Sequence, residues 1–433
     1  MGYAENHDDP SCWTSEEQEG FVKTRLLVIG DGVAPTGYAR VIHGILRNLP
    51  RDEYDIHHLA VNHWGDPHQE NWTIYPAFFG GDLQGVGRIG SLVEQIRPAI
   101  VLAVNDLWIQ KEYLRVLSPY SLRCKLICYS PLDAACVDPE WVHDFPCLSR
   151  IVVFTEFARR EVQTALPEDC STPIDVIPLG VDTEHFFPYT PNRSQESDLA
   201  STVQAKRELR LFAENDLKDS FVVLNANRNQ PRKRIDITIK GFAIFARGKP
   251  KNVQLYLHMG TEDQGWNVFK LAQRYGVDDR LILTGNNNAI PGIPSKCLNT
   301  IYNASDVGLN TCTGEGWGLC NFEHAAAGKP QVVPRVGALA EIWDGCAEFV
   351  EPTHDVVYEG ILTEGKLVDP EGVAAALEAL YTNREYRSDV ALRCYERAMR
   401  PENQWKNVAL RWHELFQEVL SGNGQRKGKD VRN

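Results

Sequence analysis

A chain of 433 residues is longer than one hydrophobic core usually serves, so its length favours two large domains. Hydrophobic residues make up 43% of the sequence and charged residues 24%, which is typical of globular proteins and excludes a disordered or membrane-embedded class. The formal net charge of -13 argues against nonspecific binding to nucleic acid, whose phosphates bind concentrated positive charge. No apolar run approaches the roughly 18 residues of a membrane-spanning helix, which leaves only peripheral membrane contact open.

The amino-terminal segment and the cysteines indicate the compartment. Residues 1–24 are acidic and polar, without the basic start and apolar centre of a secretory signal. The eleven cysteines include no close CxxC pair, and several stand in apolar runs, as in a reduced protein. We therefore expect a cytoplasmic protein in which residues 1–24 and 422–433 are loose tails.

Residues 25–186 alternate short apolar runs with helical stretches. The runs are LLVIG, IVLAV, KLICY and IVVF. Ala158, Val162 and Ala165 give one apolar face to the helix that follows the last run. This alternation predicts a Rossmann-like α/β domain, a parallel sheet covered by helices.

A second domain is predicted over residues 187–401. The segment VIPLGVDTEHFFPYTPNRSQESD first interrupts the pattern with prolines and polar residues, as a linker does. The alternation then restarts with the runs FVVLN, VQLYLHMG, RLILTG, DVGLNT and PQVVP. Pro401 interrupts a later helical stretch, so residues 402–421 are predicted to form a last helix that leaves this domain at a kink.

The stretch TCTGEGWGLCNFEHAAAGKP, residues 311–330, carries the most specific signal. It follows the predicted strand DVGLNT, so its glycine turn lies at the carboxyl edge of a parallel sheet, where open α/β folds bind ligands. Backbone N–H groups around Gly318, Leu319 and Cys320 would face an anion at the start of the next helix. Glu323 would accept hydrogen bonds from ribose hydroxyls, and Glu315 would reach hydroxyls beyond the phosphates. These features predict a nucleotide sugar as the ligand.

Basic residues follow the strand FVVLN at the same edge. Arg228 and Lys233 are assigned to the diphosphate, because a doubly charged leaving group needs fixed cations near it. Arg232 and Arg234 receive no role, since a basic run is commonly just a solvated face.

At this point the sequence resembles the glycosyltransferase family 4 enzymes, retaining transferases of the GT-B fold. The resemblance rests on Glu315 and Glu323 with seven residues between them, on the following AAAGKPQVVPRVGALAEI, on the Arg228 and Lys233 pair, and on VIPLGVDTEHFFP. It covers most of residues 25–420 and is densest in the second half. As a combination these motifs are highly specific.

The resemblance implies two facing Rossmann-like domains, the first for the acceptor and the second for the donor, with the last helix crossing back to the first. It implies a hexosyltransferase that retains the anomeric configuration and uses no metal and no cofactor, with a nucleoside-diphosphate sugar as co-substrate. UDP-glucose and GDP-mannose are the expected donors, and the acceptor is left open. The predicted site then has two groups of residues. Those expected to act in catalysis are Arg228, Lys233, Glu315 and Asp133, and those expected to bind the donor are Gly37, Gly316, Trp317, Gly318, Leu319, Cys320 and Glu323.

The first domain is predicted to contribute the loop GDGVAPTGYAR, in which Gly37 lets the backbone approach the donor phosphate or the acceptor. This loop fails as a dinucleotide fingerprint, because Pro35 stands where the third glycine would be, and we reject NAD. Many family members carry a histidine in the region that here reads KLICYSPLDA. Tyr129 and Ser130 stand there instead, and Asp133 either takes over a positioning role or belongs to an ordinary turn.

Two other function classes fit the same features. A nucleotide-sugar epimerase or a phosphorylase also uses facing Rossmann domains, and a nucleotide-sugar-binding protein without transfer activity would keep the donor site. For a metal site, the nearest acidic pair at the donor edge is Glu262 and Asp263, which we interpret as a loop. No metal ligand is therefore assigned.

Overall fold

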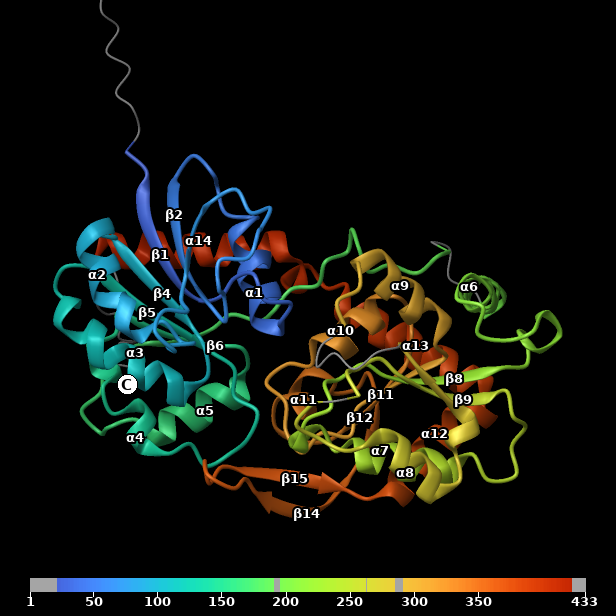
Figure 1. Ribbon diagram of the computed structural model, residues 1–433. Coiled ribbons are helices and arrows are strands. Elements are labelled where there is room, and N and C mark those ends of the chain that lie inside the picture. Colours follow the sequence, from blue (N-terminus) through green and yellow to red (C-terminus); the bar gives the residue numbers. More distant parts are fainter. Residues whose placement is uncertain (1–21, 191–194, 262, 285–290, 423–433) are drawn as a thin grey trace, which may run out of the picture.

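The computed structural model describes residues 22–190, 195–261, 263–284 and 291–422 of the chain. Two α/β domains lie side by side, each built around a parallel sheet (Figure 1). Most of the two segments expected to be tails, residues 1–21 and 423–433, lies outside the described residues, as does Glu262. None of the described helices combines the length and the apolar character that crossing a membrane requires.

The first domain contains a seven-stranded parallel sheet in the order β3-β2-β1-β4-β5-β6-β7. Its strands are β1 (Thr24–Asp31), β2 (Tyr54–Val61), β3 (Thr73–Pro76), β4 (Ile100–Val104), β5 (Lys125–Ser130), β6 (Arg150–Val153) and β7 (Ile174–Val176). The four predicted runs are β1, β4, β5 and β6, the central strands, which are buried on both faces and therefore continuously apolar. The outer strands β2, β3 and β7 carry more polar residues, which hid them in the sequence.

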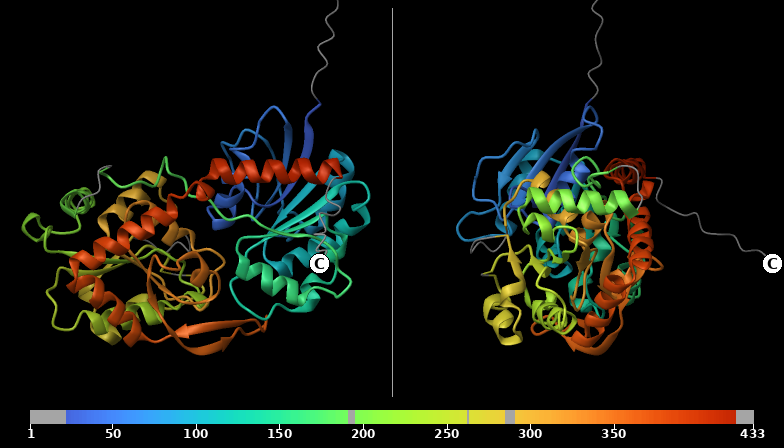
Figure 2. Two further views of the ribbon diagram at one scale, coloured as in Figure 1. Left: turned by 180° about the vertical axis from the view of Figure 1, so that it is seen from behind. Right: turned by 90° about the vertical axis from the view of Figure 1, so that its right-hand side faces the viewer.

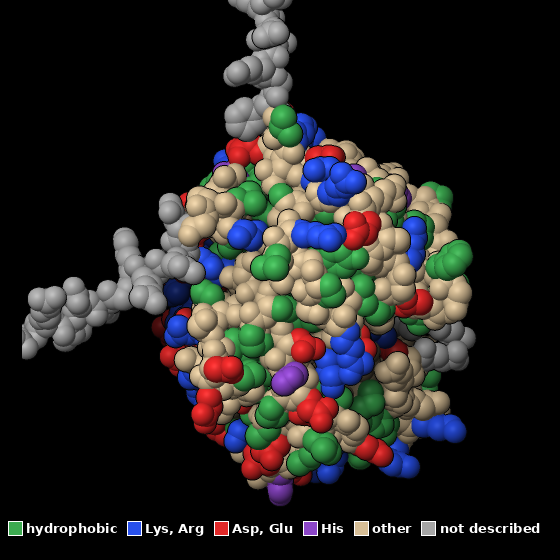
Figure 3. Space-filling model, turned by 90° about the vertical axis from the view of Figure 1, so that its left-hand side faces the viewer, with side chains coloured by type: hydrophobic (Ala, Val, Ile, Leu, Met, Phe, Trp, Pro, Cys, Tyr) green, Lys and Arg blue, Asp and Glu red, His purple; other side chains and the backbone are tan. Residues whose placement is uncertain are grey.

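Helices cover both faces of this sheet. They are α1 (Gly37–Leu46), α2 (Val86–Ile96), α3 (Leu107–Leu117), α4 (Pro139–Val142) and α5 (Glu156–Ala165). Thr36 caps α1 by accepting a hydrogen bond from the N–H of Ala39, and Thr155 caps α5 in the same way through Ala158. The outer face of the domain carries interspersed basic and acidic side chains with small apolar areas between them (Figure 3).

The second domain contains a six-stranded parallel sheet in the order β10-β9-β8-β11-β12-β13. Its strands are β8 (Phe221–Asn225), β9 (Val253–Leu257), β10 (Leu281–Leu283), β11 (Val307–Leu309), β12 (Gln331–Pro334) and β13 (Glu348–Val350). The helices are α6 (Gln195–Glu208), α7 (Ile235–Phe245), α8 (Val268–Tyr275), α9 (Ser295–Ala304), α10 (Leu319–Ala326), α11 (Gly337–Ile342), α12 (Pro370–Thr382) and α13 (Arg384–Ala398). All five runs predicted as strands in this half are strands.

The last helix, α14 (Trp405–Ser421), crosses back onto the first domain, as predicted (Figure 2). It follows a short 3₁₀ turn at Pro401–Asn403, which ends the helical run of the second domain. The hydroxyl of Tyr54 lies 2.8 Å from Nδ1 of His413, and Arg150 forms a 2.6 Å ion pair with Glu418. The crossing needs a glycine beneath it, because a Cβ at Gly44 would lie 2.4 Å from the ring of Trp405.

An antiparallel arm, β14 (Pro352–Val357) and β15 (Glu364–Val368), was not predicted. It extends from the second domain and passes beneath both domains in Figure 1. Its far strand reaches the first domain, where Glu364 and Ala135 exchange two backbone hydrogen bonds of 2.9 and 3.0 Å. The domains are thus joined by the arm as well as by the linker and α14.

Candidate active site

The glycine loop, residues 311–318, lies between β11 and α10 as the sequence predicts. Gly318 has a φ of +85°, a left-handed conformation that favours glycine, and α10 begins at the next residue. No side chain of the described residues caps the first turn of α10. The N–H groups of that turn, at Leu319 and Cys320, therefore suit an anion, which the helix dipole also favours.

The other glycines of the loop serve a close approach between the domains. A Cβ at Gly314 would lie 1.8 Å from the carbonyl oxygen of Asp133, and one at Gly316 would lie 2.6 Å from Cβ of Pro131. Only glycine permits this contact. The donor-side loop therefore packs directly on the first-domain loop that follows β5.

Glu315 is buried at the centre of this contact. Its carboxylate pairs with Nζ of Lys233, and Nη1 of Arg232 lies 3.6 Å from its Oε2 atom. Burial raises the pKa of Glu315, but the charges of Lys233 and Arg232 outweigh burial and hold the pKa below its usual value. Glu315 is therefore a carboxylate at neutral pH, and the structure pairs it with Lys233.

Arg232 is part of the site, so the interpretation of this residue as merely solvated is wrong. Its Nε atom lies 3.1 Å from Oδ2 of Asp133, and its Nη1 donates a 2.9 Å hydrogen bond to the carbonyl of Gly314. Arg232 thus joins the two domains and links Asp133 to Glu315. The partners of Arg232 lie about 80 to 100 residues away in sequence, which is why the run of basic residues did not reveal its role. Arg234, by contrast, pairs with Asp236 on the same short segment of the chain.

Glu323 lies on α10, one turn from the glycine loop, with its carboxylate buried. Nη1 of Arg40 donates to its two oxygens at 2.7 and 2.9 Å, and the hydroxyl of Tyr302 donates to Oε2 at 2.9 Å. Arg40 comes from α1 of the first domain. Neither Arg40 nor Tyr302 was predicted, because only the fold brings them to this carboxylate.

Arg228 forms a two-pronged ion pair with Asp263, with contacts of 3.0 and 3.1 Å. Asp263, which the sequence offered as the nearest imitation of a metal motif, is thus the counter-ion of Arg228. The described residues contain no group of three or more His, Cys, Asp or Glu side chains arranged to hold a metal ion. Arg228 and Lys233 therefore each have a carboxylate partner in the structure.

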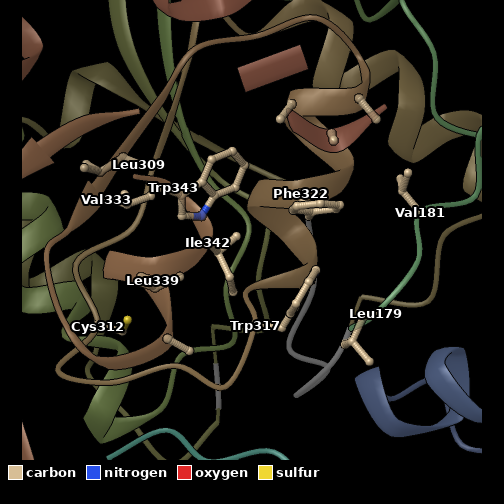
Figure 4. Close-up of a cluster of buried hydrophobic side chains, with 14 of the residues drawn as sticks. Leu179, Val181, Leu309, Cys312, Trp317, Phe322, Val333, Leu339, Ile342 and Trp343 are labelled. Carbon is tan, nitrogen blue, oxygen red and sulfur yellow. The ribbon is translucent and has the colours of Figure 1, made fainter. Parts of the chain in front are cut away.

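The side chains of Trp317 and Cys320, two of the predicted donor-binding residues, contact other residues of the second domain. The ring of Trp317 is buried, with its centroid 5.2 Å from that of Phe322, and Figure 4 shows it beside Phe322 in the apolar cluster. The Sγ atom of Cys320 lies 3.2 Å from the carbonyl of Ala226, and burial raises the pKa of this thiol to about 11. The side chain of Trp317 belongs to the core, which leaves its backbone for the predicted donor contact.

The first domain places Gly37 opposite the glycine loop. A Cβ at Gly37 would lie 3.6 Å from Cδ1 of Leu319, so the amino-terminal ends of α1 and α10 meet across the domain boundary. Tyr129 points away from this place, since its ring is buried and its hydroxyl donates to the carbonyl of Ile177 at 2.8 Å. Asp133 of that region, by contrast, reaches the predicted site through its ion pair with Arg232.

Two further residues at the carboxyl edge of the first sheet were missed. The hydroxyl of Tyr38 donates a 2.5 Å hydrogen bond to Oδ1 of Asp106, which follows β4. Burial raises the pKa of Asp106 to about 6, against the hydrogen bond from Tyr38 that lowers it. The signal was present in the sequence, because Asp106 comes directly after the predicted strand IVLAV and its flanking asparagine.

Comparison with known proteins shows what the chain is similar to. Residues 220–383 match the family described as glycosyl transferases group 1. The D-inositol 3-phosphate glycosyltransferase of Corynebacterium urealyticum is 25% identical over 249 residues, 57% of this chain and 51% of that protein. The mannosylfructose-phosphate synthase of Agrobacterium fabrum is 28% identical over 173 residues, 38% of this chain and 33% of that protein. The chain thus spans about half the length, or less, of the curated relatives it matches.

Solved structures share the whole fold. The sucrose-phosphate synthase of Thermosynechococcus elongatus superposes with a TM-score of 0.68 and 15% identity, covering 93% of this chain and 100% of that chain. The Anabaena protein HepE, solved with UDP and glucose, has a TM-score of 0.64 and 16% identity, covering 91% and 100%. The fold is GT-B. The family match over residues 220–383 and the GT-B fold both support the resemblance to the group 1, or family 4, type of glycosyltransferase.

Proposed function

We propose that the protein is a retaining hexosyltransferase that moves a hexose from a nucleoside-diphosphate sugar to an acceptor hydroxyl without a metal ion or cofactor. The observation that carries this proposal is the group of Arg232 with the buried Glu315 and Lys233, which lies next to the amino-terminal end of α10. Known proteins of the same fold support a nucleotide-sugar donor, since one was solved with UDP and glucose and another with UDP-2-fluoro glucose. UDP-glucose is therefore the first donor to test, followed by GDP-mannose.

In the proposed reaction the acceptor oxygen bonds to C1 of the hexose as the bond from C1 to the diphosphate oxygen breaks. The acceptor proton passes to the departing phosphate, and attack comes from the face that the diphosphate leaves. Lys233, Arg228 and the N–H groups at Leu319 and Cys320 stabilise the negative charge that grows on the diphosphate. Glu323 holds the ribose hydroxyls, and Glu315 holds hydroxyls of the hexose.

Asp133 and Gly37 are the first-domain residues to which this proposal assigns a role. Asp133 positions Arg232 through their ion pair, so Asp133 acts on the reaction indirectly, by orienting Arg232. Gly37 keeps the start of α1 free of a side chain, which lets backbone approach the phosphates or the acceptor. A cytoplasmic location is part of the proposal and rests on the cysteines, several of which stand in apolar runs as in a reduced protein.

The test is incubation of the full chain with UDP-glucose or GDP-mannose labelled in the hexose, with EDTA and a panel of sugar acceptors. A labelled glycoside with the anomeric configuration of the donor, formed in EDTA, is the expected product. A rearranged nucleotide sugar would instead indicate an epimerase, and labelled sugar phosphate a phosphorylase. Donor binding with no product across the panel would indicate a binding protein. Loss of transfer on chelation, restored by Mg²⁺, would contradict metal independence.

A further inference from the structure

Large apolar side chains are exposed together on two loops of the first domain, those that follow β2 and β3. Trp64 is 57% exposed and Phe79 is 77% exposed, and Phe78 and Leu83 lie on the same loops. The ring centroids of Trp64 and Phe78 are 5.4 Å apart. We call Trp64, Phe78, Phe79 and Leu83 the aromatic platform. Exposed apolar groups that gather in this way commonly mark a binding surface.

Hydrogen bonds fasten these two loops to each other. The N–H of Phe78 donates to the carbonyl of His63 at 3.2 Å, and the N–H of Asn62 donates to the carbonyl of Leu83 at 3.2 Å. Asp82 accepts hydrogen bonds from the N–H groups of Gly85 and Gly87, both at 2.8 Å. The platform is therefore held by its own backbone, with its rings left outside.

The platform adjoins the acceptor side of the candidate active site. Asn62, at the end of β2, donates a 3.0 Å hydrogen bond to Asp31 at the end of β1. Gln84, next to Leu83, accepts a 3.2 Å hydrogen bond from Asn105, which directly precedes Asp106. The two loops thus contact residues at the carboxyl ends of β1 and β4, on the same sheet edge as Asp106.

The chemistry of this edge fits a carbohydrate. The C–H faces of a pyranose ring are apolar and stack on aromatic rings, while its hydroxyls donate hydrogen bonds to carboxylates. Asp106 supplies a carboxylate at this edge, and Asp66, beside Trp64, has a side chain that is 65% exposed. Binding to an anionic membrane surface would need basic side chains. The exposed carboxylate of Asp66 beside Trp64 disfavours such binding.

We propose that the aromatic platform binds the part of the acceptor that lies beyond the sugar receiving the hexose, and that the acceptor is a carbohydrate chain of two or more sugars. The inference rests on the proposed function and adds to it the class of acceptor. The receiving hydroxyl lies at Asp133 and the glycine loop, and the chain runs past Asp106 to Trp64 and Phe79.

The test compares two double variants of the full chain. Trp64→Ala with Phe79→Ala removes the rings of the platform. Phe187→Ala with Phe269→Ala removes two aromatic rings that are 45% and 52% exposed elsewhere on the surface and serves as the matched control. Each protein is applied, with UDP present, to an array of neutral glycans of one to six sugars and to phosphatidylcholine vesicles with and without phosphatidylglycerol. Donor binding and hydrolysis of UDP-glucose are measured alongside.

We expect glycans of two or more sugars to bind the unmodified protein and the control, and the platform variant to bind them about tenfold more weakly. Donor affinity and donor hydrolysis stay unchanged in both variants. Equal glycan binding by platform and control variants would overturn the proposal, as would vesicle binding that depends on Trp64 and Phe79, or binding to no glycan. These outcomes leave the proposed function standing if donor hydrolysis persists. Absence of donor binding and hydrolysis would refute the proposed function instead.

Discussion

Glu315 and Glu323 differ in what surrounds them, and the difference predicts different kinetic effects. Glu323 contacts Tyr302 and Arg40 near the start of α10, whereas Glu315 neutralises Lys233 and Arg232 at the place assigned to the hexose. We expect Glu323→Ala to raise the donor KM about tenfold or more, because the ribose hydroxyls lose their acceptor. Glu315→Ala should lower kcat more than donor affinity. Steady-state kinetics with the donor varied check both, and unchanged constants would contradict the site.

Glu315→Ala also tests how much the ion pair with buried Lys233 contributes to the free energy of unfolding. The change leaves Lys233 buried without its carboxylate, and removing one partner of a buried pair typically costs about 3 kcal/mol. Urea unfolding monitored by fluorescence measures the loss in the free energy of unfolding. Glu378→Ala, which removes the partner of Lys249 on the surface of the second domain, is the control and should cost about 1 kcal/mol or less.

Asp106 predicts a specific pH dependence of stability. Its pKa in the folded protein is raised from 3.8 to about 6, so between these values the folded state binds more protons than the unfolded state. The contribution of Asp106 to the free energy of unfolding is therefore greatest below about pH 4 and declines as pH rises through about 6. Asp106→Asn should gain stability relative to the unmodified protein as pH rises from 4 to 7. Parallel urea curves with a constant difference over this range would contradict the assignment.

At the scale of elements, the close packing of the glycine loop predicts that one added methyl group, in Gly314→Ala, reduces turnover. Gly314→Ala places a Cβ against the carbonyl of Asp133, and the first-domain loop must move away. We expect kcat to fall about a hundredfold, with little change in the melting temperature, because the core of each domain is untouched. Gly292→Ala is the control, since a Cβ there meets nothing within 4 Å. Wild-type turnover by Gly314→Ala would show that this contact is not needed for the reaction.

The central strands and the glycine turn could be predicted because their causes are local. A strand buried on both faces needs a continuous apolar run, and a left-handed residue before a helix favours glycine, as at Gly318. The outer strands β2, β3 and β7 and the arm β14–β15 were missed, since these strands mix polar and apolar residues. Arg232 and Arg40 were missed for another reason. Their counter-ions are distant in sequence, and only the packing of the two domains brings each pair together.

At the scale of the whole molecule, the orientation of the two domains depends on polar contacts as well as on covalent connections. Arg40 pairs with Glu323 and Arg232 with Asp133 across the boundary. A third contact joins α11 to α5, because the carboxylate of Glu341 accepts hydrogen bonds from the N–H groups of Glu156 and Phe157 at 2.9 and 2.7 Å. This carboxylate caps α5 from the other domain, where the helix dipole favours negative charge.

These boundary contacts predict how the molecule responds to salt and to nucleotide. Arg40 is half exposed, so high salt screens its pair with Glu323, and Glu341→Ala removes the interdomain hydrogen bonds to the start of α5. We expect 1 M NaCl and Glu341→Ala each to increase the radius of gyration in small-angle scattering, and UDP to reverse the increase by bridging the ends of α1 and α10 to which we assign the phosphates. Arg228→Ala with Lys233→Ala should suppress the reversal at matched occupancy of UDP. Glu351→Ala, which removes a carboxylate paired with Arg335 on the surface, should leave the radius unchanged. Superimposable scattering profiles in all these conditions would show that the linker, α14 and the β14–β15 arm fix the domain orientation without the polar contacts.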